Sequence, residues 1–392
     1  MRKNPVTVGV GELVEILERY YRSASRLNYA VKILGHPGVG KSAVARQVAE
    51  RTNRLFIDTR LAFKENVDLG GYPVPEPEER RMIYFRPKFI PPEEVPAGYE
   101  GVVWLLDEAN RAHPTVIQTL FQIITERMCG EHALPAGTAI VLAGNLGEDD
   151  STIITEFDDA ALDGRLAVFH LKPVAGDWLA WARAEGLHPS VVRYISLFPE
   201  RLWDETSINP NPRGWHQTSL AISESYHLPD ETSLVRYLAS HPEGTLPGVI
   251  ESLVSRVAAR DFLLQVAAPR ELASADILDG DPGKLAAVAR GEIAAEDLLW
   301  AAAGALSRLR DLAAARRGSW GDGDLKTLAN VLSFLASARA DLRLSFFYLL
   351  VRDCGLFTQV PEAIRAIPDE ALRRAVRDRF GAMLGDADVP EP

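Results

Sequence analysis

The chain has 392 residues, 47% of them hydrophobic and 25% charged, so it can bury about two to four domain cores without disulfides or metals. Its net charge of −11 argues against a protein that binds nucleic acid through its overall charge. Cys129 and Cys354 lie too far apart for a Cys-x-x-Cys zinc site, and no run reaches the ~18 apolar residues of a membrane span, so we expect a soluble, cytoplasmic protein.

The first 172 residues alternate short apolar runs with helical patterns. Continuous apolar runs predict strands that are buried on both faces, as in a parallel sheet. The predicted strands cover residues 29–34, 55–59, 101–107, 138–145 and 166–171. The predicted helices cover residues 41–52 and 114–125. This alternation predicts an α/β fold with a parallel sheet.

Residues 70–100 interrupt the alternation because they are rich in proline and glycine. Within them, RMIYF (81–85) and RPKFI (86–90) are predicted to pair as a small hairpin. After residue 172 the strand signal fades and helical patterns dominate. Residues 252–267 and 332–353 are each predicted to form one continuous helix.

The sequence GHPGVGKS, residues 35–42, fits the phosphate-binding pattern G-x-x-x-x-G-K-[ST] between a predicted strand and a predicted helix. Glycines let backbone N–H groups close around phosphate oxygens, and the helix N-terminus adds partial positive charge. Lys41 can reach the β- and γ-phosphates, and the Ser42 hydroxyl can bind Mg²⁺. The alternative is an ordinary glycine-rich turn. The predicted nucleotide-binding residues are Gly35, His36, Pro37, Gly38, Val39, Gly40, Lys41, Ser42 and Ala43.

The sequence VVWLLDEAN, residues 102–110, reads as an apolar strand that ends in two acids. Asp107 would help to hold Mg²⁺, and Glu108 would activate the attacking water as general base. The alternative is a buried strand followed by a solvated acidic turn. The next predicted strand ends in AGN, where Asn145 could orient the same water or simply form a turn.

These motifs occur together with DLGGYPVP (68–75), the tract 105–135 and NPRGW (211–215). Over about residues 8–225 the chain resembles the MoxR group of AAA+ ATPases, in the helix-2-insert clade. The resemblance implies a five-stranded parallel sheet in the order 5-1-4-3-2, followed by a helical lid. It also implies ring oligomers, usually hexamers, which bind ATP and Mg²⁺ at sites between subunits.

The same resemblance assigns roles to three further residues. Asn145 would be sensor 1, Arg213 in NPRGW would be sensor 2 on the lid, and Arg165 would be an arginine finger that reaches a neighbour's γ-phosphate. The implied domains are an AAA+ core (1–172, with an insert at about 71–90), a helical lid (173–290) and a helical C-terminal region (291–392).

The insert is placed by the resemblance at the pore of the ring. It interleaves basic residues with aromatic ones, namely Arg80, Arg81, Arg86, Lys88, Tyr84, Phe85 and Phe89. These side chains could grip a peptide or stack on a base, or they could pack a hairpin against the neighbouring subunit, which we favour. Residues 128–137 match a second, pre-sensor-1 hairpin, in which His132 is expected at the surface rather than as a metal ligand.

Three functions fit these motifs. The favoured one is a chaperone-like AAA+ ATPase that remodels or activates a protein partner, and the resemblance implies a separate partner with a von Willebrand factor A domain. The alternative is an ATP-driven nucleic-acid motor of a restriction or defence system, which the net charge disfavours. A small-molecule kinase is the third, disfavoured because transfer to a substrate needs no water-activating Glu108.

Overall fold

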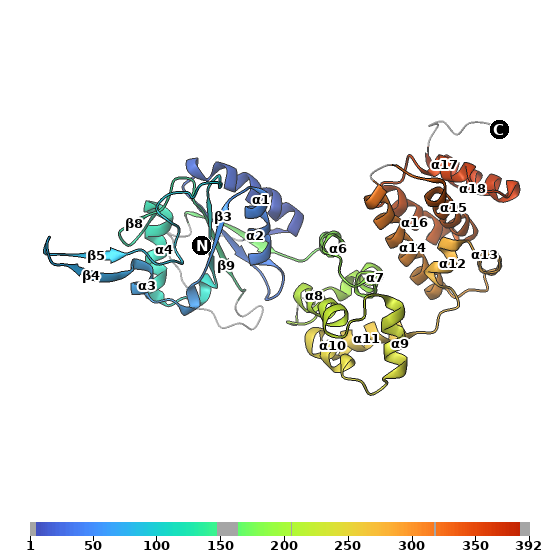
Figure 1. The fold of residues 1–392 in the computed structure, drawn as a ribbon, viewed down its shortest axis with the longest axis horizontal. Helices are drawn as coiled ribbons and strands as arrows, with labels where there is room; N and C mark the ends of the chain where they lie inside the picture. Colours follow the sequence, from blue (N-terminus) through green and yellow to red (C-terminus); the bar gives the residue numbers. More distant parts are fainter. Residues whose placement is uncertain (1–4, 147–163, 205, 317–318, 385–392) are drawn as a thin grey trace. The chain divides into compact units, whose positions relative to one another are not determined.

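The computed structural model describes residues 5–146, 164–204, 206–316 and 319–384 (Figure 1). The chain divides into two compact units whose boundaries interleave along the sequence. The first unit comprises Met1–His188, Glu200–Pro229 and Glu243–Arg260, and the second comprises Pro189–Pro199, Asp230–Pro242 and Asp261–Pro392. The division into a core, a lid and a C-terminal region at residues 172 and 290 stays a prediction.

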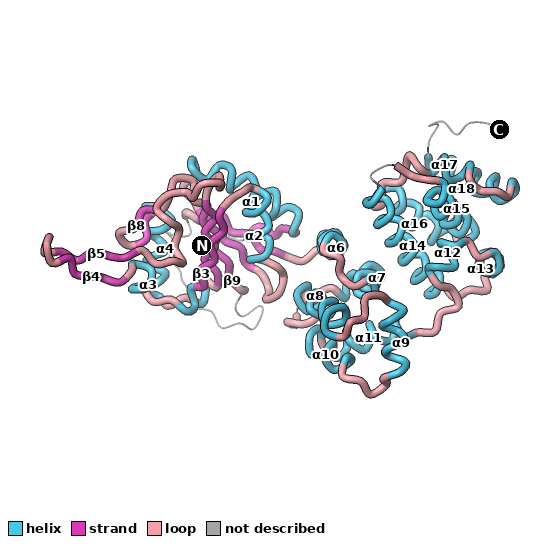
Figure 2. The backbone as a smooth tube through the Cα atoms, viewed as in Figure 1, coloured by secondary structure: helices cyan, strands magenta, loops and turns pink. Residues whose placement is uncertain are grey.

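A parallel sheet forms the centre of the first unit, with six strands among the described residues (Figures 1 and 2). The strands are β1 (Val6–Val8), β2 (Ala30–Leu34), β3 (Leu55–Arg60), β6 (Val102–Asp107), β9 (Ala139–Gly144) and β10 (Leu166–Leu171). Their order across the sheet is β1-β10-β2-β9-β6-β3. When β1 is left out and the other five strands are numbered in chain order, their order across the sheet is 5-1-4-3-2. This confirms the expected α/β fold and strand order. The extra edge strand β1 was not predicted, because three residues are too few to show a period.

Helices cover both faces of this sheet. They are α1 (Val10–Ser23), α2 (Lys41–Arg51), α3 (Asn66–Gly70) and α4 (Pro114–Glu126), with short helices η1 (Ala24–Arg26), η2 (Leu61–Phe63) and η3 (Ala109–Arg111). Side chains of β9 alternate between two cores, as the period of a strand requires. Val141 and Ala143 pack in one core with α1 and α2, whereas Ile140 and Leu142 pack in the other with α4. Because helices cover both faces, functional side chains are expected at the ends of the strands.

Two hairpins are inserted into the part of this unit that the structure describes. They are β4 (Tyr72–Glu76) with β5 (Arg81–Phe85), and β7 (Met128–Cys129) with β8 (His132–Ala133). The β4–β5 hairpin extends away from the sheet (Figure 2). The prediction that RMIYF pairs with RPKFI is wrong, since RMIYF is β5 and pairs with YPVPE. Proline has no backbone N–H to donate. Pro73 and Pro75 are two residues apart, so at both positions the side of the backbone that lacks the N–H can face the open edge of β4.

The rest of the described chain is helical, as predicted. In the first unit these helices are α6 (Ala175–Ala184), α8 (Pro212–Leu220), the π-turn η6 (Ala221–Ser225) and α10 (Leu246–Val254). The helix α11 (Arg256–Ala267) and the short helix η5 (Pro199–Arg201) have residues in both units. The second unit contains α7 (Pro189–Leu197), α9 (Glu231–Ser240), α12 (Ser274–Asp279), α13 (Pro282–Ala289), α14 (Ala295–Arg316), α15 (Asp322–Ser337), α16 (Ala340–Arg352), α17 (Val360–Arg365) and α18 (Glu370–Leu384).

The two long helices predicted at residues 252–267 and 332–353 are each broken in the structure. The first breaks at Ser255, which has a φ of 91° and therefore cannot continue an α-helix. The second breaks after Ser337, where Ala338 adopts an extended conformation before α16 begins. Hydrophobic periodicity continues through both breaks, so the pattern alone did not locate them.

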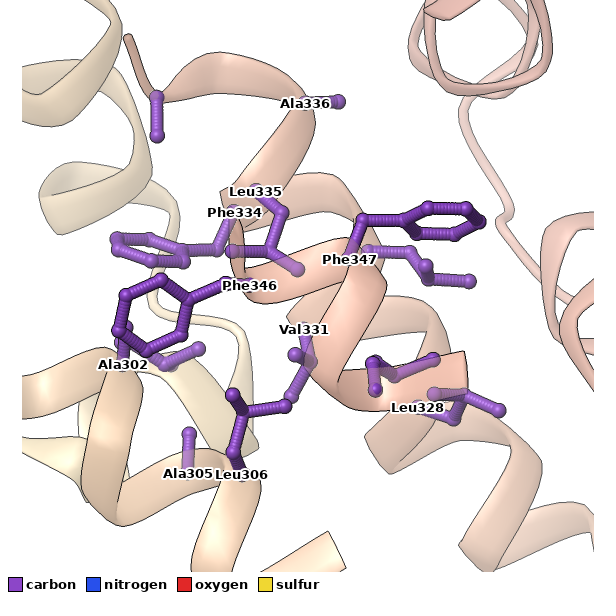
Figure 3. Packing of buried hydrophobic residues seen from close by; sticks show 14 of the residues in the cluster. Ala302, Ala305, Leu306, Leu328, Val331, Phe334, Leu335, Ala336, Phe346 and Phe347 are labelled. Atoms are coloured by element: carbon purple, nitrogen blue, oxygen red, sulfur yellow. The ribbon is translucent and has the colours of Figure 1, made fainter. Parts of the chain in front are cut away.

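The second unit is built on its own apolar core. Side chains from α14, α15 and α16 interdigitate there, including Leu306, Leu328 and Phe346 (Figure 3). Phe347 of α16 also stacks on Phe380 of α18, with ring centroids 4.4 Å apart. In the described part of the chain, no helix combines the length and the apolar character that crossing a membrane requires.

Candidate nucleotide-binding site

The carboxyl ends of three neighbouring strands bring the predicted motifs together. β2 ends at Leu34 and leads into the phosphate loop, residues 35–42. β6 ends at Asp107, and β9 ends at Gly144, next to Asn145. Since β9 lies between β2 and β6, Asn145 emerges between the phosphate loop and Asp107. Ligands of parallel α/β sheets bind at this edge, so it is the candidate nucleotide site.

The phosphate loop turns through two glycines with left-handed backbones. Gly38 has a φ of 82° and Gly40 a φ of 99°, which a residue with a Cβ would adopt only under strain. Gly40 directly precedes α2, so Lys41 and Ser42 are the first residues of that helix. The N–H groups of the first turn of α2 have no partners within the helix, which makes this terminus suited to an anion.

Lys41 is 91% buried, and its ammonium group is bound on several sides. Its Nζ donates to the carbonyl oxygens of Gly35 and His36, at 2.7 and 3.0 Å, and to Oδ1 of Asn145, at 2.9 Å. The last contact joins two residues 104 positions apart in sequence, the predicted phosphate-binding lysine and the predicted sensor 1. Charge-assisted hydrogen bonds of this kind offset the cost of burying the ammonium group.

Ser42 and Asp107, the two predicted Mg²⁺ ligands, are in direct contact. The Ser42 hydroxyl donates to Oδ2 of Asp107 at 2.7 Å, while Oδ1 of Asp107 accepts from the Glu108 N–H at 2.8 Å. Burial, followed by the neighbouring Asp107 carboxylate, raises the pKa of Asp58. A hydroxyl and a carboxylate beside a second carboxylate are hard oxygen donors in a negative field, which fits Mg²⁺.

Glu108 follows Asp107 in a left-handed conformation, with a φ of 54°. Glu108 lies between β6 and the short helix η3, and its left-handed backbone ends the strand at Asp107. The Glu108 carboxylate lies 3.5 Å from the guanidinium group of Arg111, and both side chains are partly exposed. Glu108 therefore directly follows a candidate Mg²⁺ ligand in the chain, and its carboxylate is open enough to contact a water molecule.

Arg213, the predicted sensor 2, is brought to the phosphate loop by its backbone. Asn211 caps the N-terminus of α8, where its side chain accepts from the Gly214 N–H at 2.9 Å. The Arg213 N–H donates to the carbonyl of Gly38 at 3.2 Å. A Cβ on Gly38 would lie 2.6 Å from Oδ1 of Asn211, so this close approach requires glycine at position 38. The Arg213 side chain is exposed.

Some residues at the site were not singled out from the sequence. Trp203 packs against the His36 ring of the phosphate loop, with ring centroids 5.3 Å apart. Asn211 lies within NPRGW, and an Asn before Pro at the start of a helix is a recognisable N-cap signal. Its contact with Gly38, however, joins segments far apart in sequence and gives no local pattern. Asn110 also belongs to this group, because its side chain binds the backbone of Asn145.

Arg165 lies at the amino ends of the strands, opposite the carboxyl ends that carry the candidate site. It precedes β10, and its carbonyl accepts from the N–H of Ala30, the first residue of β2. Its guanidinium carbon is 5.1 Å from the centre of the Phe121 ring on α4. The structure therefore does not bring Arg165 together with the other predicted catalytic residues of the same chain. Most of the segment that leads to it, residues 147–163, lies outside the described residues.

The basic and aromatic residues of the insert separate into two groups. Tyr72, Tyr84 and Phe85 are exposed on the β4–β5 hairpin. Arg86, which we expected to face a partner, instead donates to the carbonyl oxygens of Pro91 and Ala133, at 2.6 and 3.1 Å. It ties the base of this hairpin to the β7–β8 hairpin, since a guanidinium group can bond two carbonyls at once.

His132 is buried, so its expected position at the surface is wrong. Its Nε2 would lie 3.2 Å from a Cβ at Gly71, at the base of the β4–β5 hairpin. Burial is also the main reason why the pKa of His132 is lowered. Among the described residues, no group of three or more His, Cys, Asp and Glu side chains is arranged to hold a metal ion.

Comparison with known proteins gives partial matches. No family model matches the chain. Cytidylate kinases from Mesomycoplasma hyopneumoniae strains 7448, J and 232 are 34% identical over 91 residues. The match covers 21% of this chain and 34% of each kinase, so the chain spans about a third of the length of these curated relatives.

Two solved structures align over larger shares of the chain but at low similarity. A RuvB mutant from Thermotoga maritima is 13% identical, with a TM-score of 0.33, and the alignment covers 74% of this chain and 86% of RuvB. NtrX from Brucella abortus, in complex with ADP, is 12% identical, with a TM-score of 0.36, and the alignment covers 88% of this chain and 68% of NtrX. Similarity at this level does not assign the chain to a family.

Proposed function

We propose that the chain is a Mg²⁺-dependent AAA+ ATPase of the MoxR type. The observation that carries this proposal is the hydrogen bond of 2.7 Å between Ser42 and Asp107. It joins the phosphate loop to the acidic end of β6, and the 5-1-4-3-2 order of the sheet supports the same class. Asn145 completes the set through its contact with Lys41.

Each residue has a distinct role in the proposed reaction. Lys41 and the N-terminus of α2 bind the phosphates of ATP, which carry the charge that grows during hydrolysis. Ser42 and Asp107 would hold Mg²⁺, which when bound neutralises charge on the β- and γ-phosphates. Glu108 takes a proton from the attacking water, and Asn145 orients that water. Arg213 would contact the γ-phosphate from α8.

The test is phosphate release from ATP by the purified chain, with and without Mg²⁺. We expect steady hydrolysis that stops when EDTA removes the metal. Because the curated relatives are cytidylate kinases, CMP is added in a parallel reaction and CDP is measured. Formation of CDP at the expense of free phosphate would instead support a kinase.

The proposed assembly is a cytoplasmic homo-oligomeric ring, with hexamers expected from the resemblance. Its motivation is Arg165, which lies at the amino ends of the strands, whereas the phosphate loop follows the carboxyl end of β2, so Arg165 would act on a neighbour's nucleotide. A closed ring of head-to-tail contacts gives every site such a neighbour. We propose that ATP turnover in this ring remodels or activates a protein partner with a von Willebrand factor A domain.

The exposed hairpin offers a way to separate a protein partner from a nucleic acid. We expect a candidate von Willebrand factor A protein to stimulate ATP hydrolysis with weak dependence on salt, because Tyr84 and Phe85 would bury apolar area. DNA or RNA would release counterions on binding, so its effect would fall steeply with salt. The measurement is ATPase activity at low and high salt with each additive.

Paired variants sharpen this prediction. The double change Tyr84→Ala and Phe85→Ala should abolish stimulation by the protein, whereas Arg80→Ala with Lys88→Ala should leave most of it. Arg86 is unsuitable because it holds the base of the hairpin. Salt-sensitive stimulation by nucleic acid that disappears in the Arg80 and Lys88 pair would instead favour the motor of a restriction or defence system.

A further inference from the structure

The side chain of Asn110 binds both backbone polar groups of Asn145. Its Nδ2 donates to the Asn145 carbonyl at 2.6 Å, and its Oδ1 accepts from the Asn145 N–H at 3.2 Å. Asn110 lies in η3, two residues after Glu108, whereas Asn145 follows β9. One amide therefore ties together the two loops that carry the proposed general base and the proposed sensor 1.

This contact depends on the absence of a side chain at the neighbouring position. A Cβ on Gly144 would lie 2.7 Å from Oδ1 of Asn110 and 2.9 Å from its Cγ. Carbon atoms do not approach an amide this closely without displacing it. Gly144 has no left-handed φ that would call for glycine, so the space occupied by the Asn110 amide is the physical reason for glycine here.

The contact completes a closed path around the site, made of hydrogen bonds and two short chain segments. Lys41 and Ser42 are adjacent on α2, where Lys41 binds the Asn145 side chain and Ser42 binds Asp107. Asp107 is connected through Glu108 to Asn110 along the chain, and the Asn110 side chain donates a hydrogen bond to the Asn145 carbonyl. Glu108 is the one residue of the β6 end that has to reach the water, and it lies between two tethered points, Asp107 and Asn110.

We propose that Asn110 is a positioning residue, which holds Glu108 and Asn145 at the spacing that the attacking water requires. The inference rests on the proposed ATPase function. Asn110 does not itself have to contact ATP, because its amide is used by the Asn145 backbone. Proton transfer and orientation of one water by two side chains need both within hydrogen-bond reach, and a shift of about 1 Å can cost about 100-fold in rate.

The first experiment compares Asn110→Ala with the wild-type chain. We expect kcat for ATP hydrolysis to fall about 10- to 100-fold, with the Kd for ATP little changed, because the phosphate-binding groups keep their positions. Asn330→Ala is the matched control, since Asn330 donates to the carbonyl of Leu278 at 2.8 Å and crowds Gly280 in the second unit in the same way. This control should keep wild-type kcat.

A double-mutant cycle then separates positioning from loss of fold. Gly144→Ala places a methyl group against the Asn110 amide, so it should lower kcat in the wild-type background. In the Asn110→Ala background the methyl group meets no amide, so Gly144→Ala should add little further loss. Circular dichroism and thermal unfolding of each variant show whether a fall in kcat follows the folded fraction.

The outcomes are distinguishable. Wild-type kcat in Asn110→Ala, a loss that follows the folded fraction, or additive effects in the cycle would each overturn the positioning role while leaving the ATPase proposal in place. A wild-type chain that releases no phosphate from Mg²⁺-ATP would overturn the ATPase proposal and the inference that rests on it. A strong, non-additive loss in kcat with preserved ATP binding supports both.

Discussion

Glu108→Gln is expected to lower kcat for ATP hydrolysis by about 100- to 10,000-fold, the contribution of a well-placed general base. Glutamine has nearly the size of glutamate, so it can replace Glu108 in its left-handed conformation at the end of β6 without repacking. It cannot take a proton from water. The ion pair with Arg111 would be lost, but at 3.5 Å between partly exposed groups it stabilises the fold little. Affinity for ATP should be nearly unchanged.

The measurements are phosphate release at saturating ATP and equilibrium binding of a fluorescent ATP analogue. Glu126→Gln is the matched control, because Glu126 is exposed at the last position of α4 and should not affect either quantity. Turnover at the wild-type rate in Glu108→Gln would show that another group activates the water. A parallel loss of binding would show instead that Glu108 holds the nucleotide.

The central sheet and the residues at its edge were predictable from the sequence because their signals are local. Strands such as 102–107 are continuous apolar runs, and the glycines, lysine and serine of residues 35–42 have fixed spacing between a strand and a helix. Parallel strands align their carboxyl ends, so motifs that follow neighbouring strands must meet. The contacts of Lys41 with Asn145 and of Ser42 with Asp107 follow from that topology.

Features that depend on which segment or group becomes the partner could not be predicted in this way. RMIYF (81–85) has a strand pattern, but its choice of YPVPE as partner depends on the turn between them. The sequence suggests a partner-binding role for Arg86, because it does not show which carbonyls a guanidinium group binds, here those of Pro91 and Ala133. Asn110 belongs to the recognised motif VVWLLDEAN, but its partner Asn145 is 35 residues away, so the motif does not show the contact.

Arg165→Ala subunits are expected to hydrolyse ATP about 1,000-fold more slowly than wild type, at the lower end of the effect of an arginine finger. We expect this arginine to act on the nucleotide of a neighbouring subunit, because Arg165 directly precedes β10. β10 and β2 are parallel, and Leu166 pairs with Ala30 at the start of β2, whereas the phosphate loop follows the end of β2. At about 3.3 Å per strand residue, the length of β2 separates Arg165 from its own phosphate site. A role in catalysis therefore requires a second subunit.

Mixing Arg165→Ala subunits with Lys41→Ala subunits should restore activity that neither variant has alone. A Lys41→Ala subunit should bind ATP weakly, because it loses the buried cation that we propose binds the phosphates, but it would still present Arg165. In a randomly assembled ring with equal amounts of both, about one interface in four joins an intact phosphate site to an intact arginine, so about a quarter of wild-type activity is expected. Phosphate release is measured after pull-down through a tag on one variant, which establishes that the other has co-assembled. Mixed rings that stay as inactive as the separate variants would contradict an arginine finger at Arg165, since each such ring contains every other element of the proposed site.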